Sequence, residues 1–156
     1  MRRHLALLGL ALALSIIIGT VIVTANMGNT VEVDVWIWPQ FLTVEGFDHY
    51  HSHSSSEWVI AFIQLPRDYN TRDVDMASIT LQVSGGSVPV SHYYAIWGRI
   101  IAAKFDRTEV VDLIRTSIGH ITPQPMHKVT LVVTGDLQDG NVFRGQDTIT
   151  VFFVDE

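Results

Sequence analysis

Cysteine is absent from this chain of 156 residues. Its absence excludes a disulfide framework, a lipid anchor attached to cysteine and any metal site built from thiolates. The length suits one domain with a short additional segment, and it is too small for two domains of ordinary size.

Positive charge is also scarce, since 10 Lys and Arg residues stand against 16 Asp and Glu residues. Two of the basic residues, Arg2 and Arg3, lie at the N-terminus, which leaves 8 basic and 16 acidic residues in the rest of the chain. A body of this charge repels a nucleic-acid duplex and anionic lipid head groups. Nucleic acid is therefore not an expected partner.

The sequence motifs of common catalytic sites are missing as well. There is no Gly-x-Ser-x-Gly nucleophile elbow and no glycine loop of the kind that holds phosphate. The carboxylates of Asp136, Asp139 and Asp147 lie near a predicted turn, where aspartate commonly accepts hydrogen bonds from its own backbone. We therefore expect no enzymatic activity and assign no catalytic residue.

One long uncharged run is present, from Leu5 to Ala25, and it follows the basic sequence Met1-Arg2-Arg3-His4. A helix rises about 1.5 Å per residue, so 21 residues cover a hydrocarbon core of roughly 30 Å. The basic end should stay in the cytoplasm and send the rest of the chain outside. Residues 1–25 are thus predicted to be an N-terminal signal-anchor, and residues 5–25 to contact the membrane.

Cleavage of this leader is the alternative. Val23-Thr24-Ala25 carries small residues at the positions that a signal peptidase accepts, so cleavage after Ala25 would release a secreted protein that begins at Asn26. Against cleavage, the apolar run exceeds the roughly 7–15 residues usual for a signal-peptide core. We therefore expect a retained anchor.

The body of the protein is expected over residues 31–156, after a polar linker at 26–30. Its first strand is predicted from Val31 to Trp38, where apolar and polar residues alternate strictly, with Pro39 ending it. Alternation places Trp36 and Trp38 on the face opposite the valines. These two tryptophans are the candidate interaction residues. They could also lie near the membrane surface, and tryptophans in such a position more often pack under a neighbouring loop or strand.

The C-terminal end of the chain predicts a β-hairpin. Two β-rich runs, residues 128–137 and 142–154, flank the dipeptide Asp139-Gly140. Alternation gives one face of the hairpin the side chains Val129, Leu131, Val133, Ile149, Val151 and Phe153. An isolated hairpin is marginally stable in water, so the rest of the chain must supply strands that cover it.

The remaining pattern predicts a mainly β fold. One helix is expected after residues 106–109, a capping sequence followed by apolar residues at helical spacing, while residues 92–98 are aromatic and ambiguous. We predict an antiparallel, immunoglobulin-like β-sandwich of about seven or eight strands with one short helix. The further strands are expected at residues 41–45, 58–65, 74–83, 88–90 (an edge strand because of Pro89) and 99–105.

A His-rich loop separates two of these strands. His49, His51 and His53 occupy every second position, so an extended backbone would place all three imidazoles on one side. Three such ligands could bind zinc or copper. Otherwise the segment is a solvated loop that binds metal weakly and without function.

Several short segments form one pattern over residues 31–154: Leu65-Pro66, Asp73-Val74-Asp75, Ser78-Ile79-Thr80-Leu81, Lys104-Phe105-Asp106-Arg107, Val129-Thr130-Leu131, Thr134-Gly135, Asp139-Gly140, Phe143, Gly145 and Asp147-Thr148-Ile149. This pattern resembles an uncharacterised β-sandwich module of secreted and cell-surface proteins from bacteria and archaea. The resemblance implies a sandwich outside the cytoplasm, with no catalytic residue. Many such modules carry an Asp-rich, calcium-type loop before their Lys-Phe-Asp-Arg segment, but residues 94–100 contain no carboxylate, so calcium is not expected.

Three functional hypotheses follow. The favoured one is a non-enzymatic extracytoplasmic structural or interaction module, tethered by its N-terminal helix, such as an accessory subunit that binds other membrane or cell-surface proteins. The second is a metal-binding ectodomain that uses the His-rich loop, with copper or zinc as its cofactor; no other cofactor is expected. The third is a surface filament subunit that assembles by strand exchange, suggested by Val88-Pro89-Val90 and the separate N-terminal strand.

Overall fold

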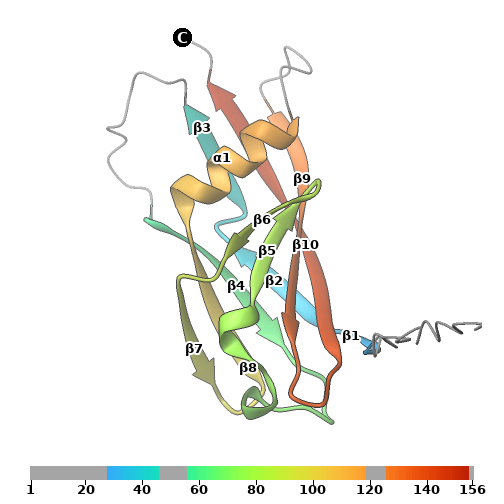
Figure 1. Ribbon diagram of the computed structural model, residues 1–156. Helices are drawn as coiled ribbons and strands as arrows, with labels where there is room; N and C mark the ends of the chain where they lie inside the picture. The colour runs from blue at the N-terminus through green and yellow to red at the C-terminus, as the bar shows by residue number, and fades with distance from the viewer. Residues whose placement is uncertain (1–27, 46–55, 119–125, 155–156) are drawn as a thin grey trace, which may run out of the picture.

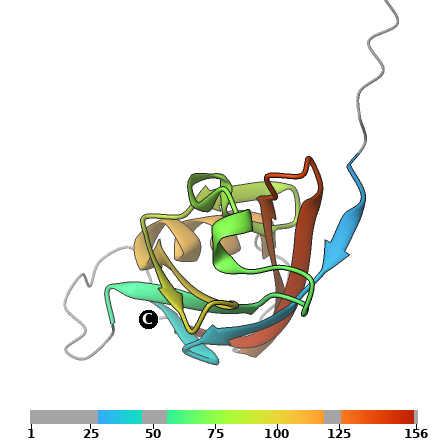
Figure 2. The same ribbon diagram turned by 90° about the horizontal axis from the view of Figure 1, so that it is seen from below.

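The computed structural model describes residues 28–45, 56–118 and 126–154, which form two β-sheets with the hydrophobic core between them (Figure 1; Figure 2). A single α-helix lies at the upper end of the sandwich in Figure 1. No helix among these residues has both the length and the apolarity to cross a membrane. The largest fully buried side chains are Ile37, Leu42, Ile63, Leu65, Ile79, Leu81, Ile101, Phe105, Ile114, Leu131, Phe143 and Ile149.

The larger sheet has the strand order β1-β10-β9-β5-β6, with β3 also paired to β10, and the smaller sheet has the order β2-β4-β8-β7. The described residues thus hold ten strands, more than the predicted seven or eight. The strands are β1 (Thr30–Glu32), β2 (Asp34–Trp38), β3 (Phe41–Glu45), β4 (Trp58–Gln64), β5 (Thr80–Val83), β6 (Gly86–Pro89), β7 (His92–Ile96), β8 (Ile100–Asp106), β9 (Met126–Asp136) and β10 (Val142–Val154). The helices are α1 (Arg107–Ile118) and the short 3-10 turns η1 (Thr71–Asp73) and η2 (Met76–Ser78).

The predicted C-terminal hairpin is confirmed. Strands β9 and β10 pair antiparallel along their length, from Val142 opposite Asp136 to Phe152 opposite Met126. The predicted alternation also holds, because Val129, Leu131, Val133, Ile149 and Val151 are buried and Phe153 packs against the core.

The prediction that residues 31–38 form one continuous strand is wrong. Strand β1 pairs with the beginning of β10, β2 crosses to the smaller sheet and pairs with β4, and β3 returns to pair with the end of β10. The β1 and β3 pairings are parallel, so the sandwich is not antiparallel throughout. Local alternation gave the correct burial of Ile37 but carries no information about which sheet each half of the run joins.

The crossing from β1 to β2 depends on close backbone contact with β10. A Cβ atom at Gly145 would overlap the side chain of Val35 and would lie 2.5 Å from the carbonyl oxygen of Val33. The Val33 N–H donates to the Arg144 carbonyl oxygen at 2.9 Å. Only glycine at this position lets the crossing strand lie directly on β10.

A carboxylate holds the crossing strand two residues further along β10. Asp147 Oδ2 accepts a hydrogen bond from the Ile37 backbone N–H at 2.8 Å and another from the Gln40 side-chain amide at 2.7 Å. The first bond gives a partner to the Ile37 N–H, which lies on the outer edge of β2. No strand among the described residues pairs with that edge. The N-terminal run is thereby fixed to β10 between its two parallel pairings.

The predicted strand over residues 74–83 is wrong in its first half. Asn70 Oδ1 accepts from the Arg72 N–H and Asp75 Oδ1 accepts from the Ala77 N–H, and these contacts cap η1 and η2. Asparagine and aspartate stabilise such turns by bonding to backbone groups two residues ahead. Regular strand therefore begins only at Thr80.

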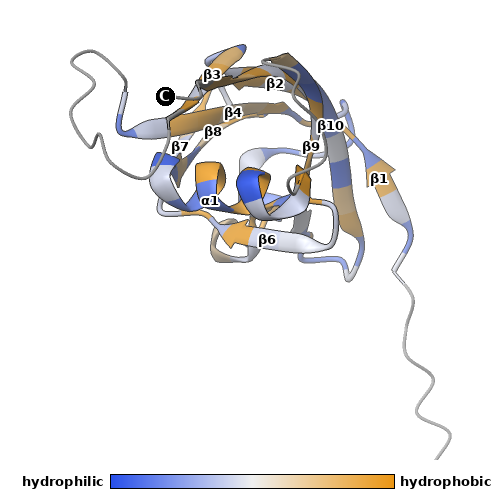
Figure 3. Cartoon of the chain, turned by 90° about the horizontal axis from the view of Figure 1, so that it is seen from above, coloured by the Kyte–Doolittle hydropathy of each residue, from blue (hydrophilic) through white to orange (hydrophobic). Residues whose placement is uncertain are grey.

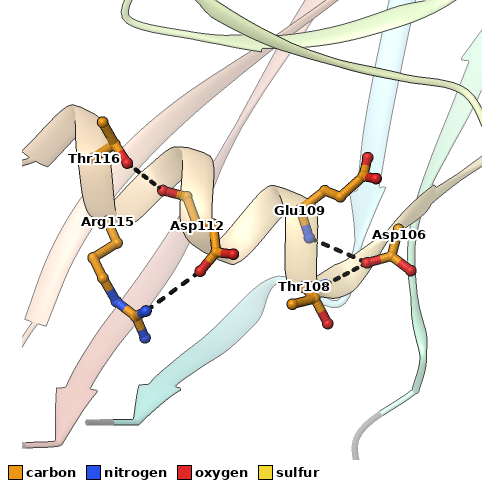
Figure 4. A network of polar contacts seen from close by, with 6 residues as sticks. All are labelled: Asp106, Thr108, Glu109, Asp112, Arg115 and Thr116. Carbon is orange, nitrogen blue, oxygen red and sulfur yellow. Dashed lines mark hydrogen bonds and ion pairs between the residues drawn. The ribbon is translucent and has the colours of Figure 1, made fainter. Parts of the chain in front are cut away.

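The helix start was predicted correctly. Asp106 Oδ1 accepts from the backbone N–H groups of Thr108 and Glu109 at 2.8 and 3.1 Å, which is the contact of an N-cap (Figure 4). Val110 and Ile114 on the inner face of α1 are fully buried. The helix thus closes the upper end of the core and also packs against β6.

Three segments meet at the opposite end of the sandwich, called the lower end here because it is at the bottom of Figure 1: residues 66–73, 97–99 and 137–141. The Thr71 N–H donates to the Gly98 carbonyl at 2.7 Å, and the Gln138 N–H donates to the Asp73 carbonyl at 2.8 Å. The start of the described chain is tied to the same end, because the Asn29 N–H donates to Asn141 Oδ1 at 2.9 Å.

Asp139 organises the 137–141 turn at this end. Its carboxylate accepts hydrogen bonds from the Asn141 N–H at 3.0 Å, the Asn141 side-chain amide at 2.8 Å and the Tyr69 hydroxyl at 3.0 Å. These donors, the Asn141 N–H above all, lower the pKa of Asp139 below its ordinary value of 3.8.

The variant Gly145→Ala tests the crossing. The added methyl group must push β1 and β2 away from β10, so we expect a loss of about 1–3 kcal/mol in the free energy of unfolding, measured by urea denaturation. Gln146→Ala, at the exposed neighbouring position, is the control and should change the stability by less than about 0.5 kcal/mol. Equal stabilities of the two variants would show that the contact at Gly145 is unimportant.

The variant Asp139→Asn tests the turn through its pH dependence. Because the folded-state pKa is lowered, the carboxylate stabilises the fold at pH values above 3.8, its ordinary pKa, and this contribution is lost as the pH falls through the folded-state pKa. The wild type should therefore be more stable than Asp139→Asn at neutral pH, and urea denaturation at decreasing pH should show the difference shrinking. A difference that stayed constant down to acid pH would contradict the assignment.

Candidate interaction surface

The outer face of the smaller sheet is unusually rich in apolar and aromatic side chains. Directly paired residues of neighbouring strands point to the same side of a sheet, and the register aligns Trp36 with Phe62, Ala102 and Tyr94. The next outward row aligns Trp38 and Ile60 with charged or polar groups on β8 and β7. We call this surface the outer aromatic face; its residues are Trp36, Trp38, Trp58, Ile60, Phe62, His92, Tyr94, Ile96, Ile100, Ala102 and Lys104.

Contacts between side chains hold this face together across all four strands. The rings of Trp36 and Phe62 stack with their centroids 5.6 Å apart, and the Lys104 ammonium group lies 5.2 Å from the centre of the Tyr94 ring. Even so, Trp36, Trp38 and Tyr94 remain 55%, 44% and 55% exposed. Figure 3 shows apolar residues concentrated along β4 and β8. Large apolar side chains therefore meet solvent on a rigid surface.

The outer face of the larger sheet is mostly polar. Cross-strand threonines form side-chain hydrogen bonds, Thr130 with Thr148 at 3.0 Å and Thr80 with Thr134 at 3.0 Å. Exposed apolar side chains there gather only near β3, where Phe41 stacks on Phe152. The two faces of the sandwich thus differ in their capacity to bind another protein.

A further exposed aromatic residue lies at the β7–β8 turn. Trp97 is 88% exposed, and its backbone is left-handed with φ of 46°, as is that of Gly98 with φ of 68°. The turn is well ordered by its hydrogen bonds, since the Leu65 N–H donates to the Arg99 carbonyl at 2.9 Å in addition to the bond to Gly98. Sequence analysis missed this residue because the aromatic segment 92–98 had no clear period.

Two open clefts lie beside the β1–β2 crossing, with volumes of about 560 and 580 Å³. Glu32 and Asp34 line both clefts, together with Arg144 in the first and with Arg67 and Arg99 in the second. Neither contains histidine, serine or a carboxylate cluster with ligand geometry. Across the described parts of the chain, no group of three or more His, Cys, Asp or Glu residues could hold a metal ion.

The structure places the two predicted interaction residues, Trp36 and Trp38, on the outer aromatic face. The proposed metal ligands His49, His51 and His53 lie outside the described residues, so copper or zinc binding there stays a prediction. The edge strand expected at Val88-Pro89-Val90 corresponds to the end of β6, which is the last strand of the larger sheet. Strand β6 also packs against α1.

Comparison with known proteins assigns no family. No protein-family model matches the chain, and neither curated proteins nor solved structures give a significant match. The functional assignment must therefore come from the chemistry of the surface itself.

Proposed function

We propose that this protein is a non-enzymatic, extracytoplasmic structural or interaction module with an immunoglobulin-like sandwich. A helix over residues 5–25 tethers it to the membrane, and the outer aromatic face binds another membrane or cell-surface protein. The observation that carries the proposal is the exposure of Trp36, Trp38 and Tyr94 on one sheet face. Tryptophan and tyrosine are enriched at the centres of protein interfaces, where they supply most of the binding energy.

Energetics support binding at this face. Covering a large apolar side chain that is otherwise exposed contributes about 1.5–3 kcal/mol, and three such rings lie on this face. Two of these rings are also held in place before binding, because Trp36 stacks on Phe62 and Tyr94 lies against Lys104. Side chains that are already ordered lose little conformational entropy when a partner covers them.

The position of the N-terminus supports a partner in or on the same membrane. A helix that ends at Ala25 leaves residues 26 and 27 before the first described residue, and an extended chain spans at most about 3.6 Å per residue. Gly28 packs directly against Gly140, so the lower end would lie within roughly 11 Å of the bilayer surface. The outer aromatic face, whose strands lead away from that end, would then face sideways toward neighbouring proteins.

Site-specific photo-crosslinking in native membranes tests this function. A photoreactive phenylalanine analogue at Trp38 should form an adduct of discrete mass, whereas the same analogue at Thr130, exposed on the opposite sheet, should not. The additional change Trp36→Ala should weaken partner binding by about 2 kcal/mol, or roughly 30-fold, and reduce the adduct accordingly.

Two results would contradict the proposal. Equal adducts from positions 38 and 130 would indicate random collision, and the absence of an adduct at position 38 would indicate that this face is free in the membrane. The circular dichroism spectra of the variants should match that of the wild type, which separates lost binding from lost folding.

A further inference from the structure

We propose that Trp97 inserts its indole ring into the head-group region of the lipid bilayer that the N-terminal tether spans. This inference rests on the tether in the proposed function and adds a second point of membrane contact. Among the exposed large apolar residues of the described chain, Trp97 has the highest exposed fraction, 88%. Its ring therefore has no partner within the sandwich that explains its presence at the turn.

Tryptophan is an unusual residue at position 97 because the backbone there is left-handed. A left-handed conformation, here with φ of 46°, is disfavoured for bulky residues and readily adopted by glycine and asparagine. Backbone conformations of this kind concentrate at functional positions, where the surrounding structure holds them. Since the ring does not contribute to the core, it indicates a contact outside the protein.

Backbone hydrogen bonds order the turn that carries the indole. The Gly98 carbonyl accepts from the Thr71 N–H at 2.7 Å, and the Trp97 carbonyl accepts from the Arg99 N–H at 2.7 Å. Residues 66–73 thus support the turn from one side. A ring presented on an ordered turn can enter a bilayer interface without first ordering its own loop.

The location of the turn identifies the occupant as lipid. Residues 97–99 lie at the lower end of the sandwich, as does the start of the described chain at Gly28 (Figure 1). When a short tether holds this end of the sandwich toward the bilayer, the β7–β8 turn faces the membrane and the Trp97 ring can meet the head groups. Tryptophan prefers the head-group region because its ring is apolar while its N–H can donate a hydrogen bond.

The charges at the lower end indicate which lipids are sufficient for the insertion of Trp97. Arg67 and Arg72 are exposed in the supporting loop, but Asp68, Asp73 and Asp139 lie in the same region. The carboxylates offset the attraction of the arginines for anionic head groups. Insertion should therefore depend on the indole, and zwitterionic lipid should be sufficient.

Fluorescence quenching by brominated lipid tests the insertion. The full-length chain is reconstituted into vesicles of phosphatidylcholine with or without bromine on its acyl chains, and vesicle flotation confirms that the chain is inserted. Of the 4 tryptophans, Trp97 alone should be quenched. The decrease in fluorescence caused by brominated lipid should therefore disappear in Trp97→Phe and remain in Trp36→Phe.

Each outcome decides the proposal. Quenching that is equal in Trp97→Phe and in the wild type, or absent although the chain floats with the vesicles, would overturn the insertion of Trp97 and leave the tether standing. A chain that does not float would contradict both the tether and the insertion that depends on it. If quenching decreased equally in Trp97→Phe and Trp36→Phe, the outer aromatic face as well as the turn would lie at the membrane, and the specific role of Trp97 would be contradicted.

The variant Trp97→Gly separates a membrane role from a structural one. Glycine relieves the left-handed backbone, so the urea midpoint of the variant should equal or exceed that of the wild type. A lowered midpoint, comparable to that of a core substitution such as Phe105→Ala, would show that the ring stabilises the fold and would overturn the proposal.

Discussion

The contact between Gly145 and the crossing N-terminal strand fixes the relation between the two sheets. At this position the backbone of β10 has no side chain, and Val33 and Val35 occupy the space that a Cβ atom would need. Two positions further along, Asp147 binds the Ile37 N–H. The strand that begins in the larger sheet can therefore leave it, enter the smaller sheet and still remain attached to β10.

The position of the candidate interaction surface depends on this crossing. Strand β2 is the first strand of the smaller sheet and carries Trp36 and Trp38, so any displacement of the crossing moves both rings. The crossing also sets the start of β1 next to the 137–141 turn, where Asn29 bonds to Asn141. One set of backbone contacts thus determines where the aromatic rings lie and from which end of the sandwich the N-terminal segment leaves.

Local features of the fold could be read from the sequence because they depend on neighbouring residues. The alternation of β10, the Asp106 cap of α1 and the strand β4, expected at residues 58–65, are examples, and all three are confirmed. The parallel pairings of β1 and β3 could not be predicted, since the partners are separated by more than a hundred residues and alternation is the same in either sheet. The capped turns at Asn70 and Asp75 were missed because short side chains there override an apparently regular strand.

The residues that carry the resemblance to a β-sandwich module have structural roles in this chain. Asp106 caps α1, Gly145 admits the crossing strand and Asp147 binds it, while Gly135 lies under the ring of Phe143, where a Cβ atom would approach to 2.5 Å. Such a pattern predicts a fold and leaves function open. Functional side chains must therefore be sought on surfaces that the pattern does not include, and the outer aromatic face is one of them.

Oxidative footprinting of the aromatic side chains shows whether a partner covers the outer aromatic face in the membrane. Hydroxyl radicals are applied to the full-length protein in its native membrane and after purification in detergent, and oxidation of each residue is measured by mass spectrometry. We expect Trp36 and Trp38 to be protected in the native membrane and to become reactive after purification, while Met126, which is 52% exposed on the opposite sheet, should react equally in both. Equal oxidation of the two tryptophans in both states would contradict a protein that works through contact at this face.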